Sequence, residues 1–431
     1  MYRTKIEDLK AWKNSPLRKP LILSGARQVG KTWLLQEFGK AEYAHLAYIN
    51  FEETSTLQNL FTIGFDIDRI LTALQIQTGV QIQPENTLLV LDEIQAVQGG
   101  LTSLKYFAEK APQYHIIAAG SLLGINLHLN ESFPVGKVDF LDLRPLSFAE
   151  FLIALGENEL TTALLKKDWV LLSLFSEKLK EYLRYYFFVG GMPEAVAVFT
   201  QNRNWQELRQ VQYRLLRAYE ADFSKHVPHE QVPRVRMVWQ SIPAQLAKEN
   251  KKFMYGVLKE GARAKEFELA IQWLVDSGLL LKSFKVSKPF LPLTAYQDAS
   301  AFKLFLLDVG LLSAMAGLNT ITIIEGNKIF KEFKGALTEQ YVMQQLRLNS
   351  ENYIGYWAND RSTAEVDFVV QRDGEVIPIE VKAGENLRAK SFKLFCDKYE
   401  PQVAVRVSLA DYKPVQWMVN IPLYGIDERI I

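Results

Sequence analysis

The chain has 431 residues, of which 48% are hydrophobic and 23% charged, and its formal net charge at pH 7 is +1. This composition is typical of a soluble globular protein, and the length predicts two to four domains. The sequence shows no apolar run near the roughly 18 residues that span a bilayer, no apolar signal-peptide core near its start, and a single cysteine, Cys396. We therefore expect a cytoplasmic protein that does not associate with membranes.

An apolar strand expected at residues 21–23 runs into a glycine-rich loop of the form G-x-x-x-x-G-K-[ST]. Glycines allow backbone N–H groups to approach phosphate closely, and the following helix directs its positive N-terminus at the same anion. Lys31 is expected to reach the β- and γ-phosphates of a nucleotide, and Thr32 to ligate Mg²⁺. The residues predicted to bind the nucleotide in this segment are Gly25, Ala26, Arg27, Gln28, Val29, Gly30, Lys31, Thr32 and Trp33.

Two further apolar strands follow. The run at residues 87–95 contains Asp92 and Glu93 near its end, as in a buried parallel strand whose C-terminal edge meets a ligand. Asp92 is expected to hold the metal ion and Glu93 to orient the attacking water, although solvated charges at a strand end give the same pattern. The run at 114–124 contains Ser121, whose hydroxyl would either sense the γ-phosphate or open a turn. Strands alternating with helices predict a doubly wound α/β domain.

Several segments resemble a widespread prokaryotic family in which an AAA-type ATPase precedes a C-terminal domain of unknown function. They are GARQVGKT, YINFEE, LDEIQ, AAGSLLG, FPVGKVDFLDLRPLSFAEF and the turn Gly190-Gly191-Met192-Pro193. The resemblance runs over nearly the whole chain and implies ATP binding and hydrolysis by the first 150 residues. Arg144 lies in a family-like segment, where it either approaches a nucleotide or is an ordinary surface arginine.

The middle of the chain is basic, with 16 Lys and Arg against 9 Asp and Glu in residues 201–290. A helical region is expected at 205–226. Two further helices, expected at 233–249 and 265–278, precede a strand pair with lysines at 282, 285 and 288, which is the helix, helix and hairpin order of a winged helix. Such a module contacts either DNA or other subunits. His226 and His229 lack partners at metal-ligand spacing and are interpreted as loop histidines. The residues proposed for DNA contact are Arg234, Arg236, Lys248, Lys251, Lys252, Arg263 and Lys265.

Near the C-terminus, the stretch EVDFVVQRDGEVIPIEVK predicts two strands joined by a tight turn at Asp373-Gly374. Residues equidistant from this turn face one another, so Asp367 is expected to lie close to Glu380. Two neighbouring acids repel unless a positive charge lies between them. An oxygen-rich site of this kind suits Mg²⁺ or Mn²⁺.

The spacing D-x(12)-E-x-K, preceded by a helix that carries Glu339, resembles the core of PD-(D/E)xK nucleases. The resemblance implies that Asp367 and Glu380 bind metal, that Glu339 is the helix acid, and that Lys382 positions water or stabilises developing charge. Val366 replaces the proline usual in that family. A solvated hairpin face with local ion pairs is the alternative interpretation.

We therefore expect a multidomain α/β protein. Its domains are an ATPase core at 1–155, a helical lid or linker at 156–225, a winged-helix-like domain at 226–300 and a restriction-endonuclease-like domain at 301–431. The predicted catalytic residues are Lys31, Glu93, Glu339, Asp367, Glu380 and Lys382.

The expected function is hydrolysis of ATP with Mg²⁺, coupled to action on DNA by a metal-dependent nuclease site that uses Mg²⁺ or Mn²⁺. One alternative is a nucleotide-operated switch or scaffold that binds DNA or protein and carries a silent nuclease-like fold; another is a protein remodeller. A homo-oligomer is one expected form of the protein.

Overall fold

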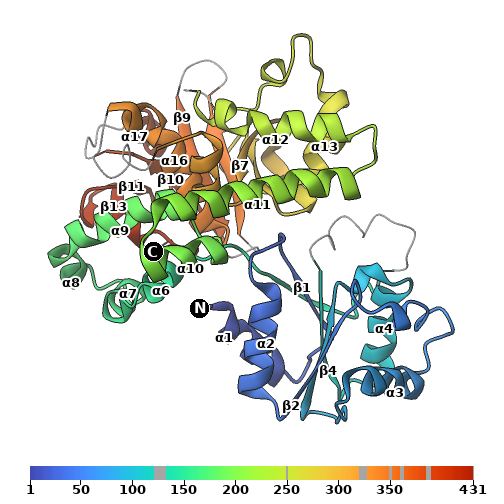
Figure 1. The fold of residues 1–431 in the computed structure, drawn as a ribbon. Helices are drawn as coiled ribbons and strands as arrows, with labels where there is room; N and C mark the ends of the chain where they lie inside the picture. The colour runs from blue at the N-terminus through green and yellow to red at the C-terminus, as the bar shows by residue number, and fades with distance from the viewer. Residues whose placement is uncertain are drawn as a thin grey trace. The chain divides into compact units, whose positions relative to one another are not determined.

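The computed structural model describes residues 1–120, 133–248, 251–319, 328–348, 352–359, 364–384 and 390–430. The chain forms two compact units (Figure 1). The N-terminal unit comprises residues 2–144 together with 276–278, and the C-terminal unit comprises residues 145–275 and 279–431.

The N-terminal unit is built on a five-stranded parallel sheet with the order β2-β3-β4-β1-β5. The interior strand β3 is buried along its whole length, as its continuous apolar sequence predicts. The strands are β1 (Leu21–Ser24), β2 (His45–Asn50), β3 (Thr87–Asp92), β4 (His115–Ala119) and β5 (Asp139–Asp142).

Within the described residues, the α-helices of this unit are α1 (Lys5–Asn14), which packs on α2, and α2 (Lys31–Glu42), α3 (Ile67–Thr78) and α4 (Gly100–Lys110). The β1–α2–β2 crossover runs along the sheet in the opposite direction to the crossovers through α3 and α4. Right-handed crossovers therefore place α2 on one face and α3 and α4 on the other, as Figure 1 shows. The prediction of a doubly wound parallel-sheet domain at the N-terminus is confirmed.

The C-terminal unit begins with a run of helices. They are α6 (Phe148–Ala154), α7 (Asn158–Leu165), α8 (Trp169–Leu174), α9 (Ser176–Val189), α10 (Pro193–Asn202), α11 (Trp205–His226), α12 (Val232–Leu246) and α13 (Ala264–Asp276). Helix α11 has the predicted bounds because Asn204 caps its first turn through the N–H groups of Gln206 and Glu207.

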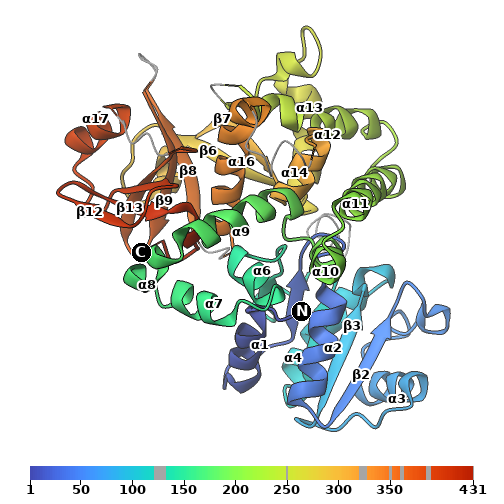
Figure 2. The same ribbon diagram turned by 60° about the vertical axis from the view of Figure 1, so that its left-hand side comes forward.

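An eight-stranded mixed sheet follows, with the order β12-β13-β11-β10-β9-β8-β6-β7. Helix α16 packs on β7 and β10, and α17 packs on β9 (Figure 2). The strands are β6 (Leu280–Val286), β7 (Gln297–Leu306), β8 (Tyr353–Ala358), β9 (Glu365–Arg372), β10 (Glu375–Val381), β11 (Val405–Ser408), β12 (Lys413–Val415) and β13 (Met418–Pro422). The remaining helices are α14 (Val309–Met315), α16 (Lys328–Leu346) and α17 (Lys390–Tyr399).

The strand pair expected as a wing is β6 and β7, and it belongs to this large sheet. Strand β6 pairs antiparallel with β7 and parallel with β8, where Phe284 lies opposite Gly355. A separate winged-helix module is therefore not confirmed, because the hairpin is held by the strands that follow it. The predicted boundary at residues 300/301 falls inside β7.

A buried carboxylate joins three elements of the C-terminal unit. Asp308 precedes α14 and accepts hydrogen bonds from the N–H of Leu311 (2.9 Å), the N–H of Gly191 (2.6 Å) and the side-chain amide of Gln344 on α16 (3.3 Å). Burial raises its pKa to about 6, against the lowering effect of these donors. A Cβ atom on Gly190 would lie 2.1 Å from Oδ1 of Asp308. The absence of a side chain at Gly190, in the predicted Gly190-Gly191 turn, therefore allows the carboxylate to approach the backbone.

Within the described residues, no helix combines the length and the apolar character needed to cross a membrane.

Candidate functional site

The predicted phosphate loop connects β1 to the N-terminus of α2. Gly25 and Gly30 have φ angles of 149° and 93°, and Gln28 has a φ of 69°. A Cβ atom on Gly25 would lie 2.3 Å from the carbonyl oxygen of Leu143, so only glycine fits there. Helix α2 starts at Lys31 without a side-chain cap on its first turn. Its N-terminal N–H groups therefore point at the loop, as an anion site requires.

Lys31 is 7% exposed, and its ammonium donates to the carbonyl oxygens of Gly25 (2.8 Å) and Ala26 (3.0 Å). Burial lowers its pKa to about 8, and the charges of Glu93 and Asp92 oppose this shift. The ammonium is therefore held within the loop by weak carbonyl partners that a phosphate group would replace.

Asp92 is buried at the end of β3 and contacts Thr32. Its Oδ2 accepts hydrogen bonds from the hydroxyls of Thr32 (3.0 Å) and Tyr48 (2.6 Å), and its Oδ1 accepts from the N–H of Glu93 (3.1 Å). A hydroxyl and a carboxylate in contact beside a phosphate loop are the donors that Mg²⁺ takes in this class of site, so these residues fit the metal. Burial and the Asp92 hydrogen bond raise the pKa of Tyr48, which keeps its hydroxyl a donor.

Glu93 follows β3 in the left-handed region, with φ 49° and ψ 44°. A non-glycine residue in this region stores backbone strain, which is common at functional sites. The side-chain amide of Gln95 donates to Oε2 of Glu93. Gln95 was not predicted as a site residue, although it lies within the LDEIQ motif.

Two arginines, Arg3 and Arg144, lie beside the phosphate loop. Arg3 is 3% exposed and donates to the carbonyl oxygens of Val29 (2.8 Å) and Arg144 (2.5 Å). Arg144 lies 3.5 Å from Asp142, which in turn accepts from the hydroxyl of Ser24 at the end of β1. Burial lowers the pKa of Arg144. Arg144 is thus held beside the loop, whereas no motif in the sequence indicated a role for Arg3. Ser121 lies outside the described residues.

The C-terminal hairpin has the predicted register. Its two-residue turn places Asp373 and Gly374 at φ 49° and 79°, and the pairing of Phe368 with Ile379 puts Asp367 opposite Glu380 at the next position. Oδ2 of Asp367 accepts a hydrogen bond from the N–H of Val381 (2.7 Å), and Lys382 lies 2.6 Å from Glu380.

Four further charged side chains lie beside these residues. Lys303, on β7, is 1% exposed; it pairs with Glu365, and its ammonium lies 3.8 Å from Oε2 of Glu339 on α16. Lys251 pairs with the other carboxylate oxygen of Glu339. We call this group the carboxylate–lysine cluster, and its members are Lys251, Lys303, Glu339, Glu365, Asp367, Glu380 and Lys382.

The cluster shifts the pKa values of its members in opposite directions. Burial, together with the charges of Glu339 and Glu380, raises the pKa of Asp367 well above its usual range. Burial also raises the pKa of Glu380, against the effect of Lys382. For Glu339, Lys251 and Lys303 overcome burial and lower the pKa. Burial disfavours the charge on Lys303, but the surrounding carboxylates raise its pKa.

The cluster as arranged does not fit a metal ion. Within the described residues, no three His, Cys, Asp or Glu side chains come together as metal ligands. Each acid named above is instead bound by a lysine or by a backbone N–H. Oε2 of Glu339 is buried and has no hydrogen-bond partner in the described part of the chain. The predicted metal roles of Asp367 and Glu380 stay predictions.

Sequence reasoning missed Lys303 and Glu365 and assigned Lys251 to DNA. Glu365 was visible as a neighbour of Asp367 on the same strand face, but Lys303 becomes a neighbour only through the pairing of β7 in the large sheet. Lys251 has a side-chain exposure of 12% and is bound to Glu339, so it does not present its charge on an open surface.

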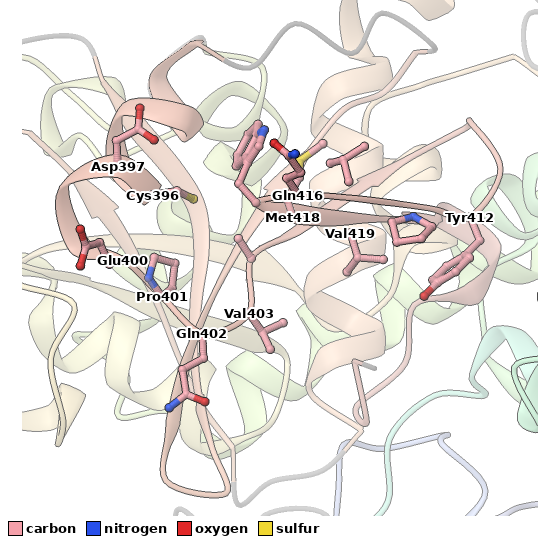
Figure 3. Close-up of a pocket in the computed structure, with 14 residues that line it drawn as sticks. Cys396, Asp397, Glu400, Pro401, Gln402, Val403, Tyr412, Gln416, Met418 and Val419 are labelled. Carbon is pink, nitrogen blue, oxygen red and sulfur yellow. The ribbon is translucent and has the colours of Figure 1, made fainter.

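The C-terminal unit has a pocket of about 470 Å³ between the end of α17 and the strands β12 and β13 (Figure 3). Asp397, Glu400 and Tyr412 line it, together with Cys396, whose thiol pKa burial raises to about 12. No residue predicted for either site lines this pocket.

Family models match three parts of the chain. Residues 17–152 match an AAA domain, residues 180–322 match a domain of unknown function (DUF8612), and residues 334–424 match another domain of unknown function (DUF4143). None of the curated proteins matches the sequence.

Similar solved structures include a Walker-type ATPase of Pyrococcus abyssi, which is 15% identical with a TM-score of 0.47 over 72% of this chain and 95% of that one. The Aeropyrum pernix ORC1 protein in complex with DNA is 12% identical, with a TM-score of 0.28 over 74% of this chain and 93% of that one. Drosophila ORC bound to DNA is 18% identical, with a TM-score of 0.25 over 73% and 94%. All three TM-scores lie below 0.5, so these likenesses carry no argument about function.

The match to the AAA domain spans the phosphate loop, the strand that ends in Asp92 and the segment that holds Arg144. Residues 17–152 therefore match an AAA domain that contains the phosphate loop and Asp92.

Proposed function

We propose that the protein binds ATP with Mg²⁺ and hydrolyses it, with Glu93 orienting the attacking water. The observation that carries this proposal is the contact of Thr32 with Asp92 beside the buried Lys31 at the start of α2. Lys31 would bind the β- and γ-phosphates, and Thr32 and Asp92 would hold the metal ion, which offsets the charge that develops during phosphoryl transfer. Arg144 would lie close enough to the loop to contribute in cis.

ATP turnover by the full chain tests this proposal. Lys31→Ala should abolish nucleotide binding, whereas Glu93→Gln should bind a fluorescent ATP analogue and turn over ATP at least about a hundred-fold more slowly. Lys40→Ala is the matched control, because Lys40 lies on the same helix and is exposed in a pair with Glu37. Turnover that survives in both site variants would reject the proposed site.

A second function, metal-dependent cleavage of DNA by the C-terminal unit, is supported by the order of its elements. Helix α16 with Glu339 precedes the antiparallel strands β8, β9 and β10, then α17, then β11 parallel to β10. The helix, strand, hairpin and helix in this order are the elements on which the predicted resemblance to a nuclease core rests. Asp367 and Glu380 face each other across the hairpin, with Lys382 two residues further on.

DNA as the partner is supported by the basic excess in residues 201–290. Of the residues predicted for this contact, Arg236, Lys252, Arg263 and Lys265 are exposed. Affinity for duplex DNA should then fall steeply as salt concentration rises. A flat salt response would leave the nucleotide-operated switch or scaffold as the better function.

Cleavage of supercoiled and linear DNA in Mg²⁺ or Mn²⁺, with and without ATP, tests the nuclease. Asp367→Asn and Lys382→Ala should both abolish cutting. Asp373→Asn is the matched control, because Asp373 is an exposed acid in the turn of the same hairpin. Bound DNA that the wild-type protein does not cut in either metal would identify the fold as catalytically silent.

A further inference from the structure

The carboxylate–lysine cluster already contains its own cations. Four carboxyl groups meet three ammonium groups there, so its formal charge is −1 when all seven are ionised. A divalent cation added to this arrangement would bring the formal charge to +1 in a largely buried site, which is unfavourable. If one lysine withdrew into solvent, the same cluster with a divalent cation would be neutral.

Lys303 is not able to withdraw. It lies within β7, opposite Ser283 of β6, and its ammonium is 4.7 Å from the centre of the Tyr356 ring. Its side chain is 1% exposed and lies between Glu339 and Glu365. Its charge is therefore a fixed part of the C-terminal unit.

Lys251 is placed differently. It lies outside the helices and strands, and its side chain retains 12% exposure while its ammonium pairs with Glu339. Two residues later the backbone is anchored, because the N–H of Phe253 donates to the carbonyl oxygen of Phe302 (2.8 Å) and the two rings stack. A lysine side chain is long and flexible, so Lys251 can reach solvent by rotamer changes while this anchor stays in place.

Glu339 also retains capacity for a further cation. Its Oε2 is buried without a hydrogen-bond partner in the described residues, and the ammonium of Lys303 is 3.8 Å away. A buried carboxylate oxygen without a close hydrogen-bond donor lowers the stability of the folded state, because its lost hydration is not replaced. A metal ion coordinated by this oxygen, near Asp367 and Glu380, would remove that cost.

We propose that Lys251 is a tethered counter-ion that occupies the cation position of the carboxylate–lysine cluster and competes with Mg²⁺ or Mn²⁺ for it. The cluster binds a divalent cation only when Lys251 swings away from Glu339. This inference rests on the candidate metal site of the C-terminal unit and is independent of ATP hydrolysis. A lysine in the cation position explains why the carboxylates lie together as the nuclease resemblance predicts, and why they are not arranged as metal ligands.

Binding of Mn²⁺ to the full chain, measured by electron paramagnetic resonance without nucleotide, tests the competition. Lys251→Met keeps the apolar stem and removes the charge, and it should gain a Mn²⁺ site at least about ten-fold tighter than any in the wild type. Adding Asp367→Asn to that variant should remove the gained site. Lys248→Met is the matched control, since the Lys248 ammonium contacts the sulfur of Met254 at 3.5 Å and is not a member of the cluster.

Chemical labelling gives a second measurement on the unaltered protein. Acetylation of Lys251, followed by mass spectrometry, should rise several-fold when Mn²⁺ is added, while Lys303 stays unlabelled with and without the metal. Equal Mn²⁺ affinity of the wild type and Lys251→Met, or labelling of Lys251 that does not respond to Mn²⁺, would overturn the proposal. Tight Mn²⁺ binding without DNA cleavage would support Lys251 as the counter-ion and reject the nuclease instead.

Discussion

At the scale of single residues, the phosphate loop places a lysine where burial works against its charge. The pKa of Lys31 is lowered to about 8 because the side chain is buried, and its ammonium donates to two carbonyl oxygens of the loop. A bound triphosphate would supply compensating negative charge and raise this pKa again. Nucleotide binding should therefore take up a proton at slightly alkaline pH.

The affinity for ATP should accordingly depend on pH through Lys31. Below pH 8 the lysine is charged before binding, and the affinity should be nearly constant. Above pH 8 the affinity should fall by up to about ten-fold per pH unit, since the free protein must first bind a proton. Titration of a fluorescent ATP analogue from pH 6.5 to 9.5 measures this effect. Lys31→Arg, which keeps its charge throughout, should remove the slope; an unchanged slope in that variant would contradict the assignment.

At the scale of helices and strands, the local part of the fold follows from the sequence. Asn204 and the apolar spacing that follows it define α11, the Asp373-Gly374 turn defines the β9–β10 register, and the glycine-rich loop defines the start of α2. The pairing of strands that are distant along the chain was not predicted. The periodicity of 280–306 predicts two strands but does not indicate which sheet they join, so the role of Lys303 was missed.

Asp308 gives a test of how these elements are held together. Its pKa in the folded protein, about 6, lies above the value of about 3.9 expected in the unfolded chain, so folding favours the protonated form. Its contribution to stability is therefore fully present below about pH 4 and is lost as pH rises through 6, by about 3 kcal/mol.

Urea unfolding of the wild type and of Asp308→Asn at pH 4 and pH 7 measures this contribution. The stability difference between the two proteins should shift by that amount in favour of the wild type at the lower pH. Asp373→Asn, at an exposed turn, should leave the pH dependence of the wild type unchanged. The same shift in both variants would show that Asp308 is not its source.

At the scale of the whole molecule, the arrangement of sheets decides where the chain can be divided. Residues 145–275 and 279–431 form one compact unit, and β7 crosses the predicted boundary at 300/301. A fragment of residues 301–431 would lose β6 and half of β7, and would leave an edge of β8 unpaired.

We therefore expect residues 145–431 to fold as a separate fragment and residues 301–431 to fail. The longer fragment should show a cooperative thermal transition by circular dichroism, whereas the shorter one should aggregate or melt without cooperativity. A sharp transition in the 301–431 fragment would show that the nuclease-like core is autonomous and that β6 and β7 are accessory.

The parallel pairing of β6 with β8 also links the evolution of the two segments to which these strands belong. One matched segment, residues 180–322, supplies Lys251 and Lys303, and the other, residues 334–424, supplies the acids that these lysines bind. A descendant that lost the first segment would keep buried acids without their cations and a sheet with an open edge. Selection would then act on the two segments as one heritable unit, and substitutions of Lys303 and Glu365 should covary across lineages.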